Sequence, residues 1–326
     1  MPEYAAIVGN HILQSYPAVD EDRLFDPTIH VSNLIDFCPK EFYLCRENGR
    51  SYHQRMYLGV RTGWDFDLGH AIQRIQADRL SLRGVLYGTW KCLHCGALEL
   101  RYFRKGIRCT SCRAKAFVPV DTTLVREIGV ITVVGNVDLF PIIQLNPPKL
   151  AVCDSKSIKA EDFDKLNGPH TSYRRQVQLY MDLIAKGARV LPNVRVVDPF
   201  PEVCTETAVI AYASKGSRPM PFKQFDVQQD PPFIQGVEEK LQSLSIHVLE
   251  GTCPPMQCGS MYDMMAKKCA VRDICFQYNQ GQEPPPPPVE IVTAPQAEDL
   301  TFPDRPVIPT RNASFTRTRR VVKEKK

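Results

Sequence analysis

Three short stretches decide the fold of this chain: Gly135-Asn136-Val137-Asp138, then Asp154-Ser155-Lys156, then Gln176-Val177-Gln178-Leu179-Tyr180. The β-branched residues 130–134 predict a strand that ends at Gly135, with Asp138 at a strand end or in a second short strand. The apolar residues 150–153 predict a buried strand leading into Asp154. Because side chains alternate along a strand, Asp154 and Lys156 are expected on one face.

The third stretch predicts a helix from 171 to about 186, capped by Thr171 or Ser172 and stopped by Gly187. Gln176 and Tyr180 are four residues apart, so they share one face of that helix. Two strands and a helix are therefore expected to bring polar groups to a single point.

These residue types suit the hydrolysis of phosphodiesters. The carboxylates of Asp138 and Asp154 can hold Mg²⁺ or Mn²⁺ through oxygen ligands, and the backbone carbonyl of Ser155 is a candidate third ligand. A bound metal activates water and offsets charge on the scissile phosphate. Lys156 can orient or deprotonate the attacking water and stabilise the anion that forms.

These motifs resemble those of the PD-(D/E)XK nuclease superfamily and, within it, of the RecB-like exonucleases. Leu68-Gly69-His70-Ala71-Ile72 resembles the helical Gly-His motif of that family, whose histidine is a metal ligand. The resemblance implies an α/β fold, with a restriction-endonuclease-like core of a central mixed sheet flanked by helices. It also implies that His70 is a further metal ligand and that the substrate is single-stranded DNA. Gln176 and Tyr180 would hold the DNA strand or Lys156 in place.

A second resemblance concerns the iron–sulfur branch of these nucleases, which includes the CRISPR-associated adaptation exonucleases. Residues 31–44 resemble the opening segment of that branch, in which one N-terminal cysteine joins three C-terminal ones around a [4Fe–4S] cluster. The resemblance implies Cys38, Cys269 and Cys275 as ligands, and Cys258 as the fourth. Ten residues separate Cys258 from Cys269, which departs from the usual short spacing and leaves Cys253 as a rival. The alternative is that these are free buried cysteines.

Four other cysteines form the pattern C-x2-C, thirteen residues, C-x2-C, at Cys92, Cys95, Cys109 and Cys112. Each C-x2-C turn aims two thiolates at one tetrahedral ion, so this spacing predicts a zinc ribbon bound to Zn²⁺. His94 lies inside a turn and is not expected to be a ligand. The intervening Arg101-Tyr102-Phe103-Arg104-Lys105 suits a phosphate backbone and stacked bases, or else it is a solvated hairpin face.

Composition limits the classes of protein to consider. The formal net charge of +5 is too small to argue for nucleic-acid binding without local patches. Twelve cysteines without a secretory signal argue for metal sites rather than disulfides, and for a cytoplasmic protein. No apolar stretch is long enough to span a bilayer, so no membrane partner is expected.

The expected organisation has four parts. Residues 1–89 form the N-terminal helical part of the nuclease domain, 90–118 the inserted zinc ribbon, and 119–278 the nuclease core with the C-terminal iron–sulfur segment. Residues 279–326 are rich in proline and end in a basic cluster, which predicts a disordered tail.

Two functions from different classes remain open on this basis. The first is a metal-dependent DNA exonuclease acting in recombination, repair, replication or CRISPR-type DNA processing, with a partner protein from one of those pathways. The alternative is a non-catalytic nucleic-acid-binding adaptor that retains the nuclease fold. A third hypothesis is a nuclease that acts on RNA. Retention of every catalytic residue type favours the enzyme.

Overall fold

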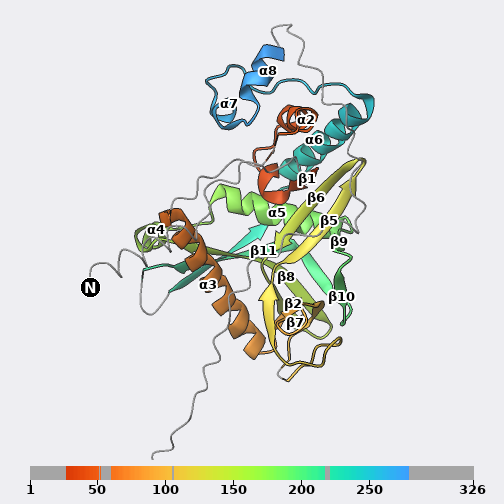
Figure 1. Cartoon of the computed structure of the whole chain (residues 1–326). Coiled ribbons are helices and arrows are strands. Elements are labelled where there is room, and N and C mark those ends of the chain that lie inside the picture. Colours follow the sequence, from red (N-terminus) through yellow and green to blue (C-terminus); the bar gives the residue numbers. More distant parts are fainter. Residues whose placement is uncertain (1–26, 51, 53–59, 105, 217–220, 279–326) are drawn as a thin grey trace, which may run out of the picture. The chain divides into compact units, whose positions relative to one another are not determined.

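The computed structural model of the chain describes residues 27–50, 52, 60–104, 106–216 and 221–278. All of them belong to one compact unit, Met1–Glu290. Strands form two mixed sheets and helices pack on them (Figure 1), which confirms the mixed α/β fold class expected from the sequence. The helices are η1 (Val31–Leu34), α2 (Pro39–Glu47), α3 (Val60–Leu82), α4 (Ala160–Lys165), α5 (Thr171–Ala185), α6 (Pro231–Glu250), α7 (Met264–Lys268) and α8 (Arg272–Tyr278).

The larger sheet has eight strands in the order β10-β3-β2-β7-β8-β11-β12, with β4 paired to β2. The smaller sheet has the order β1-β6-β5-β9. The strands are β1 (Thr28–His30), β2 (Leu86–Cys92), β3 (Leu98–Tyr102), β4 (Phe117–Val120), β5 (Thr122–Ile128), β6 (Ile131–Val137), β7 (Phe140–Leu145), β8 (Pro148–Ile158), β9 (Arg189–Val190), β10 (Val194–Val196), β11 (Glu202–Ser214) and β12 (Phe222–Gln228).

Strand β8 is the centre of the larger sheet. It pairs antiparallel with β7 and parallel with β11, and its residues Leu150, Ala151 and Val152 are all buried. A continuous apolar run of this kind is typical of a strand covered on both faces. Buried Cys153 continues the run, as expected, and packs in a second hydrophobic cluster with Ala77 of α3. The strand is therefore fixed on both sides before it reaches its polar residues.

Strand β6 is longer than the sequence predicted. The expected strand ends at Gly135, but β6 continues to Val137 and leaves Asp138 at its end. The strand continues through Gly135, because the absence of a side chain there leaves room for helix α5. A Cβ on Gly135 would lie 3.0 Å from Leu183 Cδ1 and 3.1 Å from the Tyr180 ring. Gly135 therefore serves close packing of helix on sheet rather than chain reversal.

Helix α5 begins at Thr171, with His170 as the N-cap residue and no capping hydrogen bond from its side chain. The expectation of a cap by Thr171 or Ser172 is wrong, because both already lie within the helix. The helix ends before Gly187, which has a left-handed φ of 76° as expected of a C-terminal stop. Its buried face packs on β8 and β11 of one sheet and on β5 and β6 of the other.

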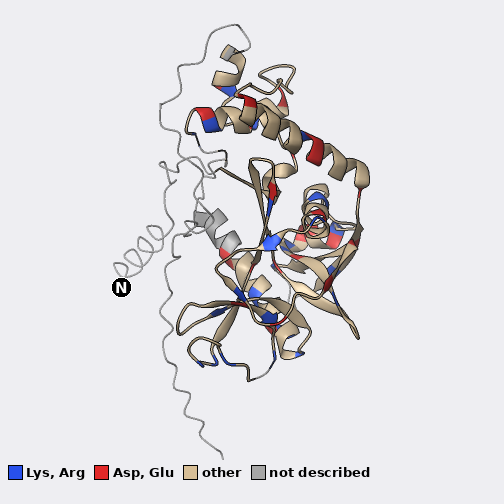
Figure 2. Ribbon diagram, turned by 90° about the vertical axis from the view of Figure 1, so that its right-hand side faces the viewer, with Lys and Arg blue, Asp and Glu red and all other residues tan. Residues whose placement is uncertain are grey.

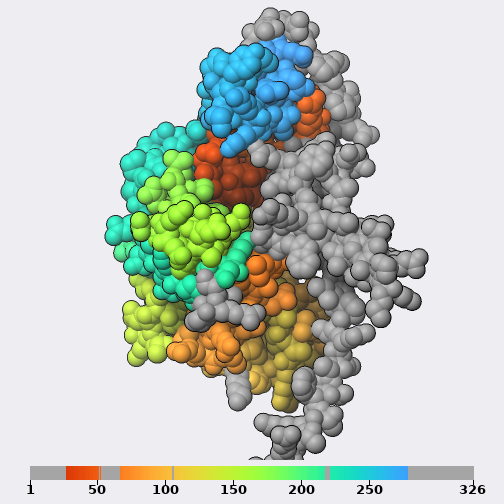
Figure 3. All heavy atoms as spheres, turned by 90° about the vertical axis from the view of Figure 1, so that its left-hand side faces the viewer, coloured from red at the N-terminus to blue at the C-terminus, as the bar shows by residue number. Residues whose placement is uncertain are grey.

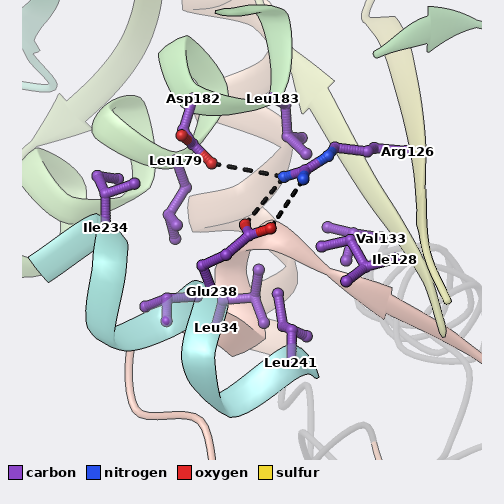
Figure 4. Close-up of a pocket in the computed structure, with 11 residues that line it drawn as sticks. Leu34, Arg126, Ile128, Val133, Leu179, Asp182, Leu183, Ile234, Glu238 and Leu241 are labelled. Carbon is purple, nitrogen blue, oxygen red and sulfur yellow. Dashed lines mark hydrogen bonds and ion pairs between the residues drawn. The ribbon is translucent and has the colours of Figure 1, made fainter. Parts of the chain in front are cut away.

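A partly buried ion-pair network ties α6 to β5 and α5. Arg126 Nη2 lies 2.8 Å from Glu238 Oε1, and Arg126 Nη1 lies 3.7 Å from Asp182 Oδ2 (Figure 4). Lys186 Nζ lies 3.0 Å from both carboxylates. The adjoining cavity has a volume of about 10 Å³, close to a single water-sized sphere. The network is therefore part of the packing between elements and is not a ligand site.

Residues 86–120, which include the predicted zinc ribbon at 90–118, contain strands β2, β3 and β4. Strand β2 pairs with β3 and β4, and its first residues, Leu86 and Tyr87, pair with β7 of the main sheet. Trp90 is almost fully buried in the cluster that also holds Ala77 and Leu139. The ribbon is therefore an extension of the larger sheet. The predicted disordered tail, 279–326, lies outside the described residues.

Candidate active site and cysteine sites

Asp138 lies opposite Asp154. Leu139 forms an antiparallel bridge with Cys153, with hydrogen bonds of 3.1 and 3.0 Å in the two directions. In antiparallel pairing the residues on either side of such a bridge also face each other, so Asp138 faces Asp154. The Asp138 carboxylate accepts a hydrogen bond of 2.8 Å from the backbone N–H of Ser155. The two predicted carboxylates therefore meet, although they come from different elements.

Lys156 completes this group. Its Nζ donates a hydrogen bond of 3.0 Å to Asp154 Oδ1 and lies 2.8 Å from Oδ2. The second contact is an ion pair without hydrogen-bond geometry, so Oδ2 has no hydrogen-bond partner. The ammonium also lies 4.7 Å from the centre of the Tyr173 ring on α5. Alternation along β8 thus puts Asp154 and Lys156 on the face covered by α5, as the sequence predicted.

Burial and mutual repulsion perturb these groups. Burial raises the pKa of Asp138 well above its ordinary 3.8, and the charge of Asp154 raises it further. Burial also raises the pKa of Asp154, although Lys156 acts to lower it. Burial alone would lower the pKa of Lys156, but Asp154 and Asp138 raise it above 10.5. Buried Asp154 and half-buried Asp138 therefore share a single cation, which leaves room for a second positive charge.

Gln176 and Tyr180 lie on α5, and Gln176 Nε2 donates a hydrogen bond of 2.8 Å to the Tyr180 hydroxyl. Tyr180 is buried against Gly135. Burial raises the pKa of its hydroxyl well above 10.0, and the charges of Asp154 and Asp138 raise it further. The two residues therefore form a neutral pair beside the carboxylates, where Gln176 holds the tyrosine hydroxyl.

Helix α3 contacts the opposite face of β8. Gln76 contacts Ser155 Oγ, and a Cβ on Gly69 would lie 3.1 Å from Ser157 Oγ. Figure 3 shows part of the surface of α3 in orange. His70 is exposed on this helix. The described part of the chain contains one group of three or more possible metal ligands, the ribbon cysteines, and this group includes neither His70 nor Asp138 and Asp154. The role of His70 as a metal ligand therefore stays a prediction.

Asp121 is a third carboxylate that the sequence did not suggest. Thr122 pairs with Val137 in the β5–β6 hairpin, so Asp121 comes directly opposite Asp138 when the register is extended by one residue. Its charge contributes to the raised pKa of both Asp138 and Asp154. Gln73 of α3 donates a hydrogen bond of 2.9 Å to Asp121 Oδ1. No local motif marks this residue; only the strand register reveals it.

Cys92, Cys95, Cys109 and Cys112 form a compact site. Their sulfur atoms lie within 4.8 Å of one another, with Cys92–Cys112 at 3.6 Å and Cys95–Cys109 at 3.7 Å. Tetrahedral zinc with Zn–S bonds of about 2.3 Å requires sulfur separations of about 3.8 Å. The four thiols can therefore hold a metal ion, and their spacing fits zinc. Buried Glu99 braces the second turn, accepting hydrogen bonds of 2.7 and 2.6 Å from Thr110.

The other five cysteines of interest share one region. Cys38 precedes α2, Cys269 follows α7, Cys275 lies in α8, and Cys253 and Cys258 lie between α6 and α7. Burial raises the pKa of Cys275, and the charges of Cys253 and Cys258 raise it further. Among the described residues, these thiols do not form a group of three or more that could hold a metal ion. The two ends of the unit thus meet here, with Cys253 and Cys258 both close to Cys275.

Comparison with known proteins gives a likeness of fold only. No family model matches the chain, and no curated protein is significantly similar to it in sequence. The solved structure of SSO0001 matches at 14% identity and a TM-score of 0.36, over 83% of this chain and 97% of that one. An alkaline exonuclease (LHK-Exo) from Laribacter hongkongensis matches at 11% identity and a TM-score of 0.36, over 69% and 89%. Its complex with dAMP matches at 12% identity and a TM-score of 0.33, over 69% and 89%.

No helix within the described ranges combines the length and the apolar character needed to cross a bilayer.

Proposed function

We propose that the chain is a metal-dependent nuclease that hydrolyses phosphodiester bonds in DNA. The observation that carries this proposal is the meeting of Asp138, Asp154 and Lys156 at adjacent strand positions. Placing half-buried Asp138 opposite buried Asp154 is costly for a protein without a ligand, and one ammonium does not offset both carboxylates. A divalent cation does, and it would supply a Lewis acid for the phosphate and for water.

The residues divide the work by position. Asp138 and Asp154 would hold Mg²⁺ or Mn²⁺, with the Ser155 carbonyl as a further ligand. Lys156 faces the same space, where its ammonium can orient the attacking water and stabilise the charge that develops on the phosphate. Gln176 and Tyr180 would keep the DNA strand or Lys156 in place. Tyr173, whose ring lies beside Lys156, limits the directions that the ammonium can take.

The third carboxylate of the site is proposed to be Asp121. The family resemblance gives the remaining ligand role to His70, but the register places Asp121 next to Asp138. A pair of single variants separates these assignments. Asp121→Asn should weaken Mg²⁺-dependent cleavage strongly, whereas His70→Ala should leave most of it. The reverse result would restore His70 as the ligand.

The substrate is proposed to be single-stranded DNA cut from an end, with a role in recombination, repair, replication or CRISPR-type processing and a partner protein from such a pathway. The compartment is proposed to be the cytoplasm. Labelled single- and double-stranded DNA and RNA, with and without blocked ends, distinguish these substrates directly. Binding without cleavage under every metal condition would instead favour the adaptor.

The second group of cysteines is proposed to hold a [4Fe–4S] cluster through Cys38, Cys269, Cys275 and either Cys258 or Cys253. Their meeting from both ends of the unit supports a structural closure of that kind. The first group is proposed to hold one Zn²⁺. Anaerobic purification followed by metal analysis should give about four irons and one zinc per chain. Zinc without iron would reject the cluster and leave the nuclease proposal intact.

Cleavage assays on variants of the central group test the proposal itself. Asp154→Asn and Lys156→Ala should each abolish Mg²⁺- or Mn²⁺-dependent cleavage while the far-ultraviolet circular dichroism spectrum stays native. Ser157→Ala, on the other face of β8, is the matched control and should retain activity. Full activity in either of the first two variants would reject this site.

A further inference from the structure

The positive charge of this chain is concentrated in the ribbon. Residues 90–118 contain seven Lys and Arg against a single acidic residue, Glu99, so the rest of the chain has a net charge of −1. Glu99 is fully buried, and Arg101 Nη1 lies 2.6 Å from its carboxylate. The one acidic group of the ribbon is therefore used internally, and the remaining cations have no acidic neighbour within the ribbon.

Four of those cations are exposed: Arg104, Arg108, Arg113 and Lys115. Among the residues that the structure describes, none of the four forms an ion pair with Asp or Glu. Figure 2 shows blue segments on the loops at the lower end of the ribbon diagram. Like charges that are held together without counterions repel each other, so a surface of this kind is stabilised by an anionic partner.

Arg113 gives a second and independent sign of function. Among the residues that the structure describes, Arg113 is the one residue other than glycine with a positive φ, 66°. It follows the second C-x2-C turn directly, as Gly96 (φ 76°) follows the first. The N–H of Gly96 donates to Cys92 O at 2.9 Å, and the N–H of Arg113 donates to Cys109 O at 2.9 Å. Glycine adopts this conformation without strain and arginine does not. A strained arginine where glycine fits is explained by a need for its charge.

The ribbon's aromatic rings are already engaged. Tyr102 packs edge-on against Tyr87 with ring centres 4.9 Å apart, and Phe103 packs on buried Trp90 at 4.3 Å. Those rings fix the ribbon to the sheet instead of offering open faces for stacked bases. The chemistry left on the surface is cationic, which recognises phosphates regardless of base sequence.

The ribbon is also joined to the site. The chain leaves β4 at Val120 and reaches Asp121 at the next residue. Arg113 and Asp121 are eight positions apart in the sequence, so their Cα atoms are at most about 28 Å apart. One strand of nucleic acid advances about 3.4 Å per nucleotide in a duplex, so about eight nucleotides cover that span.

We propose that the exposed cations of the ribbon bind the phosphate backbone of the DNA strand whose end lies in the site. Nucleic acid is taken as the partner because of the proposed function; the charge and the strain at Arg113 stand apart from it. The ribbon then acts as a fixed guide that holds the strand several nucleotides from the reacting bond. Such a guide raises affinity for long strands and has no effect on substrates too short to reach it.

The test compares three variants with the wild-type chain. The first carries Arg104→Glu, Arg108→Glu and Arg113→Glu. The matched control makes the same change of charge on α4, α7 and α8, with Lys165→Glu, Lys267→Glu and Arg272→Glu. The third is Arg113→Gly alone, which relieves the strain and removes one charge. Zinc content and the unfolding temperature show that each variant retains its ribbon.

Binding of a labelled single strand of about 30 nucleotides is followed by fluorescence anisotropy, with Ca²⁺ in place of Mg²⁺ to prevent cleavage. The ribbon variant should lose about tenfold or more in affinity, and its salt slope should fall by about 2, because each lost phosphate contact contributes about 0.7. The control should bind like wild type. Arg113→Gly should bind more weakly while its unfolding temperature stays equal or rises.

Wild-type affinity in a zinc-loaded ribbon variant, or an equal loss in the control, would overturn this inference. Hydrolysis of bis(p-nitrophenyl) phosphate, which is too small to reach the ribbon, reports on the site alone. If wild type hydrolyses neither substrate but the binding difference holds, the proposed nuclease function fails and the ribbon inference stands. If wild type cleaves DNA and the ribbon variant binds normally, the ribbon inference fails and the proposed nuclease function stands.

Discussion

Lys156 holds the carboxylate of Asp154 from two residues further along the same strand, with Nζ 3.0 Å from Oδ1 and 2.8 Å from Oδ2. Asp154 is only 1% exposed, and Asp138, which lies between β6 and β7, faces it. The pair is thus a largely buried salt bridge with a surplus negative charge beside it.

Replacing Lys156 and replacing Asp154 should lower the free energy of unfolding by different amounts. Lys156→Met leaves buried Asp154 and half-buried Asp138 without their cation and should lower the free energy of unfolding by about 3 kcal/mol in metal-free buffer. Asp154→Asn removes one of the repelling charges and leaves Lys156 beside Asp138, so its cost should be smaller or absent. Urea denaturation of both single variants and the double variant measures the coupling. Equal losses in the two single variants would contradict this account.

The metal-free protein should lose stability as the pH rises above 4. The pKa of Asp138 is raised by burial and by Asp154 above its ordinary 3.8. Between pH 3.8 and the raised pKa of Asp138, the folded chain binds more protons than the unfolded chain. The free energy of unfolding therefore falls with rising pH until the pH exceeds the raised pKa. The raised pKa of Lys156 does not interfere, because its contribution is lost only above 10.5.

A divalent ion holds Asp138 ionised, so Mg²⁺ or Mn²⁺ should raise the unfolding temperature more at pH 8 than at pH 5. Differential scanning fluorimetry across this range tests the expectation, and Asp138→Asn should remove most of the metal effect. An increase in unfolding temperature that does not depend on pH would show that the metal binds elsewhere.

Gly135→Ala should separate packing from chemistry. The added Cβ would lie 3.0 Å from Leu183 Cδ1 and 3.1 Å from the Tyr180 ring, closer than most real contacts. We expect a loss of about 1–3 kcal/mol in the free energy of unfolding as α5 moves off β6. The maximal rate of cleavage should fall with it, since Tyr180 and its hydrogen-bonded Gln176 move. Thermal denaturation and cleavage rates check both effects, and Gly168→Ala, which meets no neighbour, is the control.

The ion-pair network on α6 should become less stabilising in acid. Burial would raise the pKa of Glu238, but hydrogen bonds from Arg126 and Lys186 lower it below 4.5. The contribution of Glu238 is therefore present above 4.5 and is lost as the pH falls through the lowered pKa. Glu238→Gln should cost about 2 kcal/mol at neutral pH and progressively less below pH 4.5. A cost that is constant with pH would mean that the charge of Glu238 is not what stabilises α6.

Local sequence determined the parts of this protein whose geometry is local. Alternation along one strand places Asp154 and Lys156 together, helical spacing pairs Gln176 with Tyr180, and two C-x2-C turns position four thiols. The physical reason is that backbone periodicity fixes the relation between residues only a few positions apart.

The tertiary structure alone decided which distant residues meet. The strand register brings Asp121 and Asp154 to either side of Asp138, and no short motif encodes register between strands that are far apart in the sequence. Packing also decided that Gly135 continues a strand, because Tyr180 and Leu183 occupy the space above it. His70 and the second cysteine group depend on how whole elements dock, and helical periodicity cannot choose the face of a sheet on which a helix lies.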